Sequence, residues 1–205
     1  MTVGLFFSRR ARAVPKLPPA PPVVYHRPLI MLRRATHADQ VDIRRVMEAS
    51  LASIGSRYYD GQQVASALEW VARPDPQIID DGTYFVVEQD GRIVACGGWS
   101  RRGRLYAGSS PESDEGRLLD PATDAARVRA MFVDPRYSRR GLGRVILEAC
   151  ESEARLAGFR SVELMALLSG EELYAACGYQ VVERVDITLG DGVVLGGAKM
   201  VKQLS

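Results

Sequence analysis

The stretch SRRGLGR, residues 138–144, constrains the fold of this chain more than any other segment. It follows an apolar run, RVRAMFVDP, that has the pattern of a strand ending at Pro135, and it leads into a helical pattern over residues 143–156 that Gly158 terminates. Another apolar run, SVELMAL, then predicts a second strand. A strand, a helix and a strand form a crossover unit, so the two strands should be parallel and connected in the right-handed sense.

The N-terminal half predicts a strand, two helices and a hairpin. LIMLRRAT is typical of a short strand, and Thr36 is placed to cap the helix that follows. A second helix, QQVASALEWVA, should end at Pro74 and Pro76, because proline cannot continue a helix. Asp90-Gly91 between two apolar runs indicates a β-hairpin.

The C-terminal half adds a loop, a short helix and two strands to the crossover unit. Residues 107–124 are polar and rich in turn residues, which predicts a long loop. SGEELYAAC indicates a short helix with Ser169 as N-cap, and the last two strands meet across residues 190–192. The predicted order β-α-α-β-β-β-α-β-α-β-β gives an α/β fold with a mixed, mostly antiparallel sheet and helices on both faces.

The composition argues against several classes of protein. Cys96, Cys150 and Cys177 form no C-x-x-C pair, which argues against a disulfide scaffold or a zinc ribbon and favours a reducing, cytoplasmic environment. With only His26 and His37, a histidine metal site or a Ser-His-Asp triad is hard to build, and we expect no metal. No apolar stretch approaches the ~20 residues of a membrane span.

Residues 1–28 differ from the rest of the chain in composition. They are rich in proline and arginine without a strand or helix period, which predicts a disordered extension before one domain over residues 29–205. A start at Met31 and a basic docking arm are two further interpretations of this segment. Seven of the 27 basic residues and none of the 25 acidic ones lie in residues 1–38, so the body is mildly acidic and the pI of the whole sequence says little about nucleic acid binding. We expect no nucleic acid partner.

The SRRGLGR loop has the properties of an anion site. Gly141 and Gly143 lack Cβ atoms, so backbone N–H groups can approach a ligand, and the following helix offers unpaired N–H groups at its positive end. Arg139, Arg140 and Arg144 add bidentate donors. These groups suit a phosphate or pyrophosphate, whereas a plain glycine-rich connection is the structural alternative.

Two common phosphate motifs fit the loop poorly. A Walker loop, G-x-x-x-x-G-K-[ST], is absent. A dinucleotide loop, G-x-G-x-x-G, would need a glycine at Ile146 and a tighter turn after Val133, although Glu163 stands where a ribose-binding acid would lie. A Rossmann domain would also continue with further βα units, whereas this chain ends in hairpin-like strands.

Two stretches of the chain match the two sequence motifs of one family, and the first of these motifs binds phosphate. VDPRYSRRGLGRVILEACE matches a pattern of Gln or Arg, two residues, Gly, one residue, then Gly or Ala, with Ser138 in the first place. LYAACGY, roughly thirty residues on, matches Leu-Tyr followed by Gly and an aromatic residue. From about Leu29 onward the chain therefore resembles the GCN5-related N-acetyltransferase (GNAT) family. The resemblance implies a sheet whose central pair of parallel strands is splayed.

The resemblance also implies acetyl-CoA as co-substrate. Its pyrophosphate would lie on the loop, and its pantetheine arm would add to the edge of the preceding strand. Leu167 stands where the family frequently has Asn, a role that Ser169 could replace. The implied cofactor-binding residues are Met131, Phe132, Val133, Ser138, Arg139, Arg140, Gly141, Leu142, Gly143, Arg144 and Ser169.

The family's chemistry is direct attack of a primary amine on the thioester in a ternary complex. Tyr174 matches the tyrosine that protonates the leaving thiolate, and a backbone N–H near Val133 would stabilise the oxyanion. The sequence does not identify the general base, and the candidates are a water relay and several acidic residues. These acids are Glu88, Glu112, Asp114, Glu115 and Glu163.

The acceptor implied by the resemblance is a small-molecule amine or a peptide amine. Aromatic side chains suit amines through cation–π contacts, and the candidates are Tyr58, Trp99 and Tyr106. A non-catalytic acyl-CoA-binding sensor or interaction module on the same fold is the alternative, since fold does not fix function. The presence of Tyr174 favours an enzyme. The sequence leaves open whether the chain forms a homodimer, and we expect no membrane partner.

Overall fold

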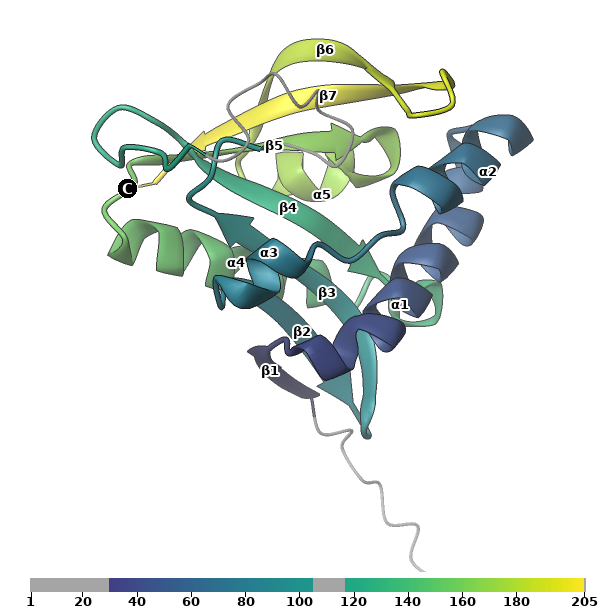
Figure 1. Cartoon of the computed structure of the whole chain (residues 1–205), viewed down its shortest axis with the longest axis horizontal. Helices are drawn as coiled ribbons and strands as arrows, with labels where there is room; N and C mark the ends of the chain where they lie inside the picture. The colour runs from purple at the N-terminus through teal and green to yellow at the C-terminus, as the bar shows by residue number, and fades with distance from the viewer. Residues whose placement is uncertain (1–29, 105–116, 205) are drawn as a thin grey trace, which may run out of the picture.

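The computed structural model describes residues 30–104 and 117–204 as a seven-stranded sheet with helices on both faces (Figure 1). The strands lie in the order β1-β2-β3-β4-β5-β7-β6. The strands are β1 (Ile30–Arg34), β2 (Tyr84–Gln89), β3 (Arg92–Ser100), β4 (Ala126–Val133), β5 (Ser161–Leu167), β6 (Gln180–Thr188) and β7 (Val194–Gln203). The helices are α1 (Gln40–Ser53), α2 (Gly61–Trp70), α3 (Pro76–Asp80), α4 (Leu142–Leu156) and α5 (Glu171–Ala176).

The predicted fold class is confirmed, including the parallel crossover. Among the described strands, only β4 and β5 pair in parallel, and all other neighbouring strands are antiparallel. The central pair is splayed as the resemblance implied, because β4 and β5 pair only at Ala126↔Val162 and Arg127↔Glu163. Glu163 forms ion pairs with Arg127 and, at 3.1 Å, with Lys199, which joins β4, β5 and β7 at this narrow end.

A bulge in β4 accompanies the separation of the two strands. Gly98 lies opposite Arg129 and Cys96 opposite Phe132, so two residues of β4 face one residue of β3. Ala130, in the bulge, has a φ of 53°. The Tyr84 hydroxyl donates to the carbonyl of Ala130 at 3.1 Å and holds it in place.

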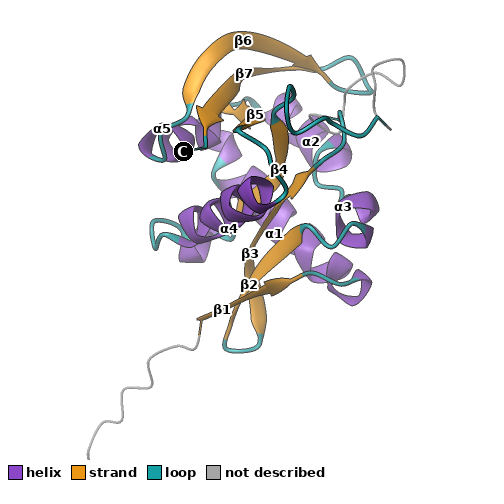
Figure 2. Ribbon diagram, turned by 90° about the vertical axis from the view of Figure 1, so that its left-hand side faces the viewer, coloured by secondary structure: helices purple, strands orange, loops and turns teal. Residues whose placement is uncertain are grey.

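Each face of the sheet has its own apolar core. Figure 2 shows α4 and α5 on one side of the strands and α1, α2 and α3 on the other. Helix α4 buries Ile146, Leu147, Cys150 and Ala154, which recur three and four residues apart, against the first face. Burying one such Leu or Ile side chain stabilises the fold by about 1.5–3 kcal/mol. Helix α1 covers the opposite face with the same spacing.

Helix α3 is absent from the predicted order. We expected Pro74 and Pro76 to end the second helix, but α2 ends at Trp70 and Pro76 begins α3. Asp75 caps α3, since its carboxylate accepts from the backbone N–H of Gln77 at 2.9 Å. Proline is favoured in the first turn of a helix because it needs no N–H there. The Asp-Pro pair was therefore a start signal as well as a stop signal.

The predicted N-cap of the short C-terminal helix is wrong by one residue. Ser169 lies inside a 3₁₀ turn over Leu168–Gly170, and Gly170 is the N-cap of α5. Thr36 caps as expected, but it caps a 3₁₀ turn over His37–Asp39 that leads into α1.

Some expectations fall outside the described residues. They concern the extension over residues 1–28, Tyr106, and the loop acids Glu112, Asp114 and Glu115. Within residues 30–104 and 117–204, no helix is long and apolar enough to cross a membrane. In the same part of the chain, no three His, Cys, Asp or Glu side chains are grouped so that they could hold a metal ion.

Candidate functional site

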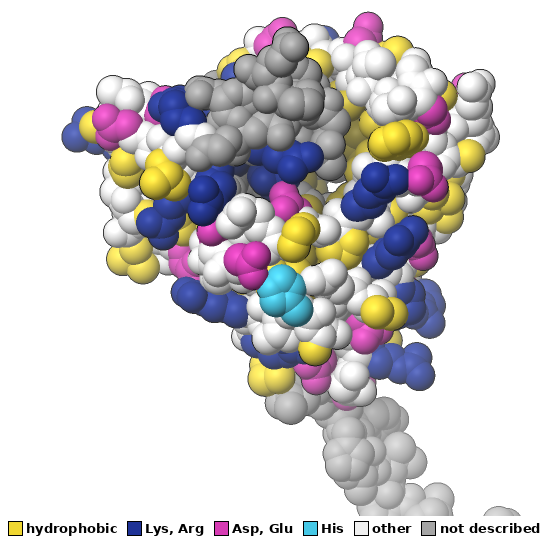
Figure 3. Space-filling model, viewed as in Figure 1, with side chains coloured by type: hydrophobic (Ala, Val, Ile, Leu, Met, Phe, Trp, Pro, Cys, Tyr) yellow, Lys and Arg dark blue, Asp and Glu magenta, His cyan; other side chains and the backbone are white. Residues whose placement is uncertain are grey.

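A cavity of about 900 Å³ opens where β4 and β5 separate. Its lining comes from both faces of the sheet, so the cavity passes between the splayed strands. Figure 3 looks onto the α1–α3 face and shows a hollow at its centre with Lys and Arg side chains around it. The two walls of this cavity come from different parts of the chain.

The first wall, the glycine-loop wall, is made by the segment from Tyr137 to Arg144 and by residues 169–176. Gly141 is the N-cap of α4 with a φ of 80°, and a side chain there would meet no other atom. Its glycine is therefore required by conformation, because only glycine adopts this φ without strain. Arg139 also has a positive φ, 62°. The two left-handed residues turn the chain sharply into α4.

Gly143 has a different reason to be glycine. A Cβ atom there would lie 2.8 Å from Cδ2 of Leu173 in α5. The absence of a side chain leaves room for the Leu173 side chain, so the start of α4 packs against α5 at this glycine. The sequence predicts that the missing Cβ atom lets backbone N–H groups approach a ligand, and the contact with Leu173 is a second reason for glycine here.

Ser138 and the three arginines are tethered locally. The Ser138 hydroxyl donates to the carbonyl of Pro135 at 2.8 Å, so it stabilises the turn before the loop. Arg144 donates to the carbonyl of Ala176 at 3.1 Å, and Arg139 lies 3.6 Å from Glu172. Arg140 lies over the Tyr137 ring and is not part of the cavity lining.

Asp134 connects the end of β4 to this loop. It is almost fully buried, and it accepts hydrogen bonds from the backbone N–H of Arg136 at 3.0 Å and from its guanidinium at 2.7 Å. These hydrogen bonds hold the pKa of the Asp134 carboxyl below its usual range. The start of the glycine loop is thus fixed by an ionised carboxylate.

The edge of β4 contributes backbone groups to the cavity. The N–H of Asp134 donates to Val94 of β3 at 2.9 Å. Because successive residues of a strand turn their N–H and C=O groups to opposite edges, those of Val133 point away from β3, into the gap left by β5. Met131 and Val133 pack toward the α4 face and Phe132 toward the α1 face, and all three line the cavity.

Tyr174 lies in the glycine-loop wall. Its side chain is buried, it lines the cavity, and its ring meets that of Tyr179 edge to face at 5.9 Å. Burial raises the pKa of the Tyr174 phenol above its ordinary value, so the hydroxyl is protonated at neutral pH. The hydroxyl donates no hydrogen bond within the described residues. It is available as a proton donor.

The second wall, the α1–α3 wall, is made by segments that are far apart in the sequence. The end of α1, the 3₁₀ turn after it, the α2–α3 loop and the end of β6 all contribute. Its residues are Ser50, Leu51, Ser53, Ile54, Arg57, Tyr58, Val71, Arg73, Asp75, Ile187 and Leu189. Tyr58 thus lines the cavity, as the sequence suggested, with 43% of its surface exposed.

Trp99 lies elsewhere. It is 2% exposed, packs edge to face on Phe159, and donates from its indole nitrogen to Glu153 of α4 at 2.9 Å. It does not line the cavity, because its position on β3 turns it into the core under α4. Among the acids proposed as a general base, Glu163 is held in its ion pairs and Glu88 pairs with Arg33 at 3.1 Å. Neither lines the cavity.

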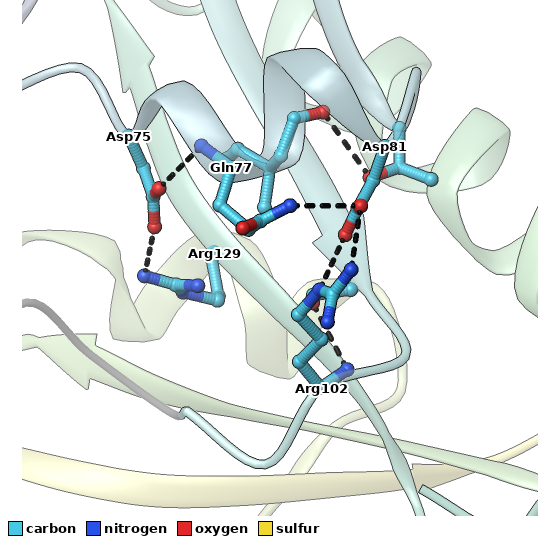
Figure 4. Close-up of polar contacts among 8 residues, drawn as sticks. Asp75, Gln77, Asp81, Arg102 and Arg129 are labelled. Carbon is cyan, nitrogen blue, oxygen red and sulfur yellow. Dashed lines mark hydrogen bonds and ion pairs between the residues drawn. The ribbon is translucent and has the colours of Figure 1, made fainter. Parts of the chain in front are cut away.

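Five charged residues that line the cavity were not among the site residues predicted from the sequence. Arg129, inside β4, donates to Asp75 at 2.6 Å and so joins β4 to α3 (Figure 4). Arg102 binds both oxygens of Asp81 at the other end of α3, at 2.9 and 3.0 Å, outside the cavity. The missed charged lining residues are Arg57, Arg73, Asp75, Arg129 and Glu172. Arg129 could have been recognised as a candidate site residue, because it is a charged residue inside an otherwise apolar strand.

Comparisons with known proteins agree with this architecture. Residues 80–181, from the last residue of α3 to the start of β6, match the family model described as an acetyltransferase (GNAT) domain. No curated protein matches the sequence.

Three solved structures illustrate the shared fold. A GCN5-related N-acetyltransferase from Rhodopseudomonas palustris has a TM-score of 0.63 at 20% identity, over 89% of this chain and 99% of that one. The PaiA N-acetyltransferase of Thermoplasma acidophilum, solved with coenzyme A, has 0.61 at 13%, over 85% and 99%. YncA of Salmonella typhimurium, solved with acetyl-CoA, has 0.57 at 18%, over 86% and 95%. At these identities the likeness establishes the fold.

Proposed function

We propose that this chain, which belongs to the GCN5-related N-acetyltransferase (GNAT) family, transfers an acetyl group from acetyl-CoA to a primary amine. The observation that carries the proposal is the cavity between β4 and β5, because the glycine loop, the edge of β4 and Tyr174 all line it. An anion site, an extended edge and a proton donor therefore share one space. The CoA and acetyl-CoA bound in two of the similar structures support this choice of co-substrate.

In this proposal acetyl-CoA lies along the glycine-loop wall. The backbone N–H groups from Arg139 to Gly143 and the N-terminal end of α4 bind the pyrophosphate. The pantetheine arm pairs with the edge of β4 at Met131 and Val133, as an added strand. The thioester then lies between the splayed strands, with the acceptor amine on the α1–α3 side.

The reaction is a single displacement at the thioester carbonyl. The amine nitrogen attacks, the C–N bond forms, and the C–S bond breaks. The nitrogen releases a proton to water in the cavity, while the CoA sulfur receives a proton from Tyr174, which is then reprotonated from solvent. The N–H of Val133, pointing into the gap, donates to the oxyanion of the tetrahedral intermediate.

The test is release of CoA from acetyl-CoA, followed with a thiol reagent, against a panel of primary amines. We expect amine-dependent release by the wild-type chain, and we expect Tyr174→Phe to lower kcat while acetyl-CoA still binds. Binding of acetyl-CoA without release on any amine would overturn the enzyme and support a non-catalytic acyl-CoA-binding module. Failure to bind CoA at all would overturn the site.

A further inference from the structure

We propose that the acceptor is a small amine that carries a carboxylate beside an apolar side chain, as a free amino acid does. This inference rests on the proposed acetyl transfer and names the class of its second substrate. It is carried by the charges and the apolar surface of the α1–α3 wall, which lies opposite the glycine loop.

The charges facing the acceptor side of the cavity are mostly positive. Arg57 and Arg73 come from the α1–α3 wall, and Arg129 comes from the adjoining face of β4. Asp75 is the one carboxylate among the described residues of this part of the lining. An acceptor entering here therefore meets three guanidinium groups and one carboxylate.

Asp75 is already engaged on both oxygens. One oxygen accepts from the backbone N–H of Gln77 at 2.9 Å, and the other accepts from Arg129 at 2.6 Å (Figure 4). The side chains of Asp75 and Arg129 are 14% and 6% exposed, so water screens this ion pair little. Asp75 is consequently poorly placed to receive a second ammonium group of a polyamine.

Arg57 and Arg73 differ in how they are held. Arg73 lies over the Trp70 ring at 4.8 Å and donates to the Glu69 carboxylate at 2.7 Å, so its charge is largely balanced. The guanidinium of Arg57 has no hydrogen-bond or ion-pair partner within residues 30–104 and 117–204. Its planar donors match a carboxylate in two-point geometry. Arg57 is the residue that we assign to the acceptor carboxylate.

The remainder of the α1–α3 wall is largely apolar. Leu51, Ile54 and Val71 line it from the helices, and Ile187 and Leu189 line it from the end of β6. Tyr58 follows Arg57 directly and adds an aromatic surface. An apolar or aromatic side chain next to the carboxylate would cover these residues, and removing this apolar surface from water favours binding.

The experiment measures kcat/KM for acetylation of L-phenylalanine, phenethylamine, L-phenylalaninamide and spermidine. Phenethylamine and phenylalaninamide both lack the carboxylate, and their amines are respectively more and less basic than that of phenylalanine. We expect kcat/KM for phenylalanine to exceed that for either of these amines by at least about 10-fold, which corresponds to 1.4 kcal/mol. Spermidine should have the lowest kcat/KM of the four. Arg57→Gln should remove this preference through KM, with kcat within about 2-fold.

Arg44→Gln is the matched control, because Arg44 is an exposed arginine of α1 that pairs with Glu48 and lies outside the cavity. It should leave the preference unchanged. A second measurement, binding of N-acetyl-L-phenylalanine and N-acetylphenethylamine to the CoA-loaded protein, needs no turnover and should show the same Arg57-dependent difference.

The outcomes separate the two proposals. Acetylation of spermidine or phenethylamine ahead of phenylalanine, or a preference unaffected by Arg57→Gln, overturns the carboxylate inference and leaves acetyl transfer standing. Bound acetyl-CoA with no amine acetylated overturns acetyl transfer. In that case Arg57-dependent binding of N-acetyl-L-phenylalanine still supports a carboxylate site on this wall, and equal binding of the two acetyl compounds overturns it.

Discussion

The two walls of the cavity are built from different parts of the polypeptide. The glycine-loop wall comes from two short stretches, residues 137–144 and 169–176. With the adjoining edge of β4 it offers mainly backbone groups, in the turn from Ser138 to Gly143 and the first turn of α4. The α1–α3 wall collects side chains from four separate segments between Ser50 and Leu189. Backbone groups are present whatever the side chain, whereas side-chain groups change with every substitution.

This difference separates the part of the site that is set by local conformation from the part that can vary on the same fold. The first wall depends on backbone angles, so its sensitive positions are those with a positive φ, such as Gly141. The second wall depends on which side chains meet, so its chemistry can change without altering the sheet. Specificity for the acceptor is therefore expected to reside in the second wall.

The largest effect is expected at Tyr174, the side chain of the first wall that we propose as the proton donor. Tyr174→Phe keeps the buried ring and removes the proton donor, so kcat should fall by about 100-fold or more. The melting temperature should stay within about 2 °C, because the hydroxyl donates no hydrogen bond in the described structure. Steady-state kinetics and a thermal melt measure the two effects.

Tyr179→Phe is the matched control for that variant. Tyr179 packs on Tyr174, and its own hydroxyl is buried without a hydrogen-bond partner within the described residues. Its removal should leave kcat within about 2-fold and leave stability equal or higher. An equal loss of kcat in both variants would assign the effect to packing and would remove Tyr174 as the acid.

The next variant tests whether CoA binding at the glycine-loop wall depends on backbone conformation. Gly141→Glu introduces a side chain at a φ of 80° and a negative charge at the proposed pyrophosphate site. We expect the Kd for CoA to rise by about 30-fold, roughly 2 kcal/mol. Gly192→Glu is the control, since Gly192 has a φ of 82°, equally open space and no place in the cavity. Calorimetric titration showing equal CoA binding by both variants would refute the assignment.

A smaller effect concerns the carboxylate that anchors the first wall. The hydrogen bond from Arg136 lowers the pKa of Asp134, so its stabilising contribution is present above the pKa of an unfolded aspartate, about 3.9, and is lost as the pH falls through the folded value. At pH 7 we expect Asp134→Asn to unfold more easily by about 1–3 kcal/mol. The difference from wild type should shrink below about pH 4 in urea titrations.

Asp124→Asn provides the comparison for Asp134. The Asp124 carboxylate pairs with Arg117 at 2.9 Å and is more exposed to solvent than Asp134. Replacing it should therefore lower the free energy of unfolding by less than Asp134→Asn does at pH 7. If the stability difference of Asp134→Asn were independent of pH, the ionised carboxylate would not be what anchors the loop.

The smallest effect is expected for a side chain of the first wall. Arg139→Gly removes one charge and relieves a φ of 62°, so CoA affinity should fall by only about 3-fold while stability rises by up to about 1 kcal/mol. Asp90→Gly, at a φ of 52° in the β2–β3 turn, should gain similar stability with no change in CoA binding. A loss for Arg139→Gly larger than that for Gly141→Glu would show that side chains, rather than the backbone, carry this wall.

Much of the fold was predictable because its signals are local. The strand, glycine turn and helix around SRRGLGR, the Asp90-Gly91 hairpin and the final two strands are all present as expected. Helix α3 was missed because it spans only five residues, too few to show a helical period, and its Asp-Pro start resembled a helix stop. Ser169 was displaced as N-cap by a 3₁₀ turn that shifts the start of α5 to Glu171.

The candidate site was predictable on one wall only. The residues expected along the glycine loop and β4 line the cavity together, except Arg140, because a contiguous stretch and one parallel crossover bring them there. On the other wall, Tyr58 lines the cavity but Trp99 lies in the core. The position of Trp99 depends on its contacts with Phe159 and Glu153. These residues lie 54 or more positions away in the sequence, so no local pattern encodes the contacts.

The sequence by itself determined the glycine turn into α4, the order of the strands and the parallel crossover, because backbone sterics and apolar periodicity act between near neighbours. Only the tertiary structure decided how far β4 and β5 separate and which charges face the opening. The bulge at Ala130 is held by Tyr84, and Arg129 reaches Asp75 across 54 positions of the chain. Such contacts form only when the whole sheet and both its helical layers are assembled, because each needs partners that distant segments supply.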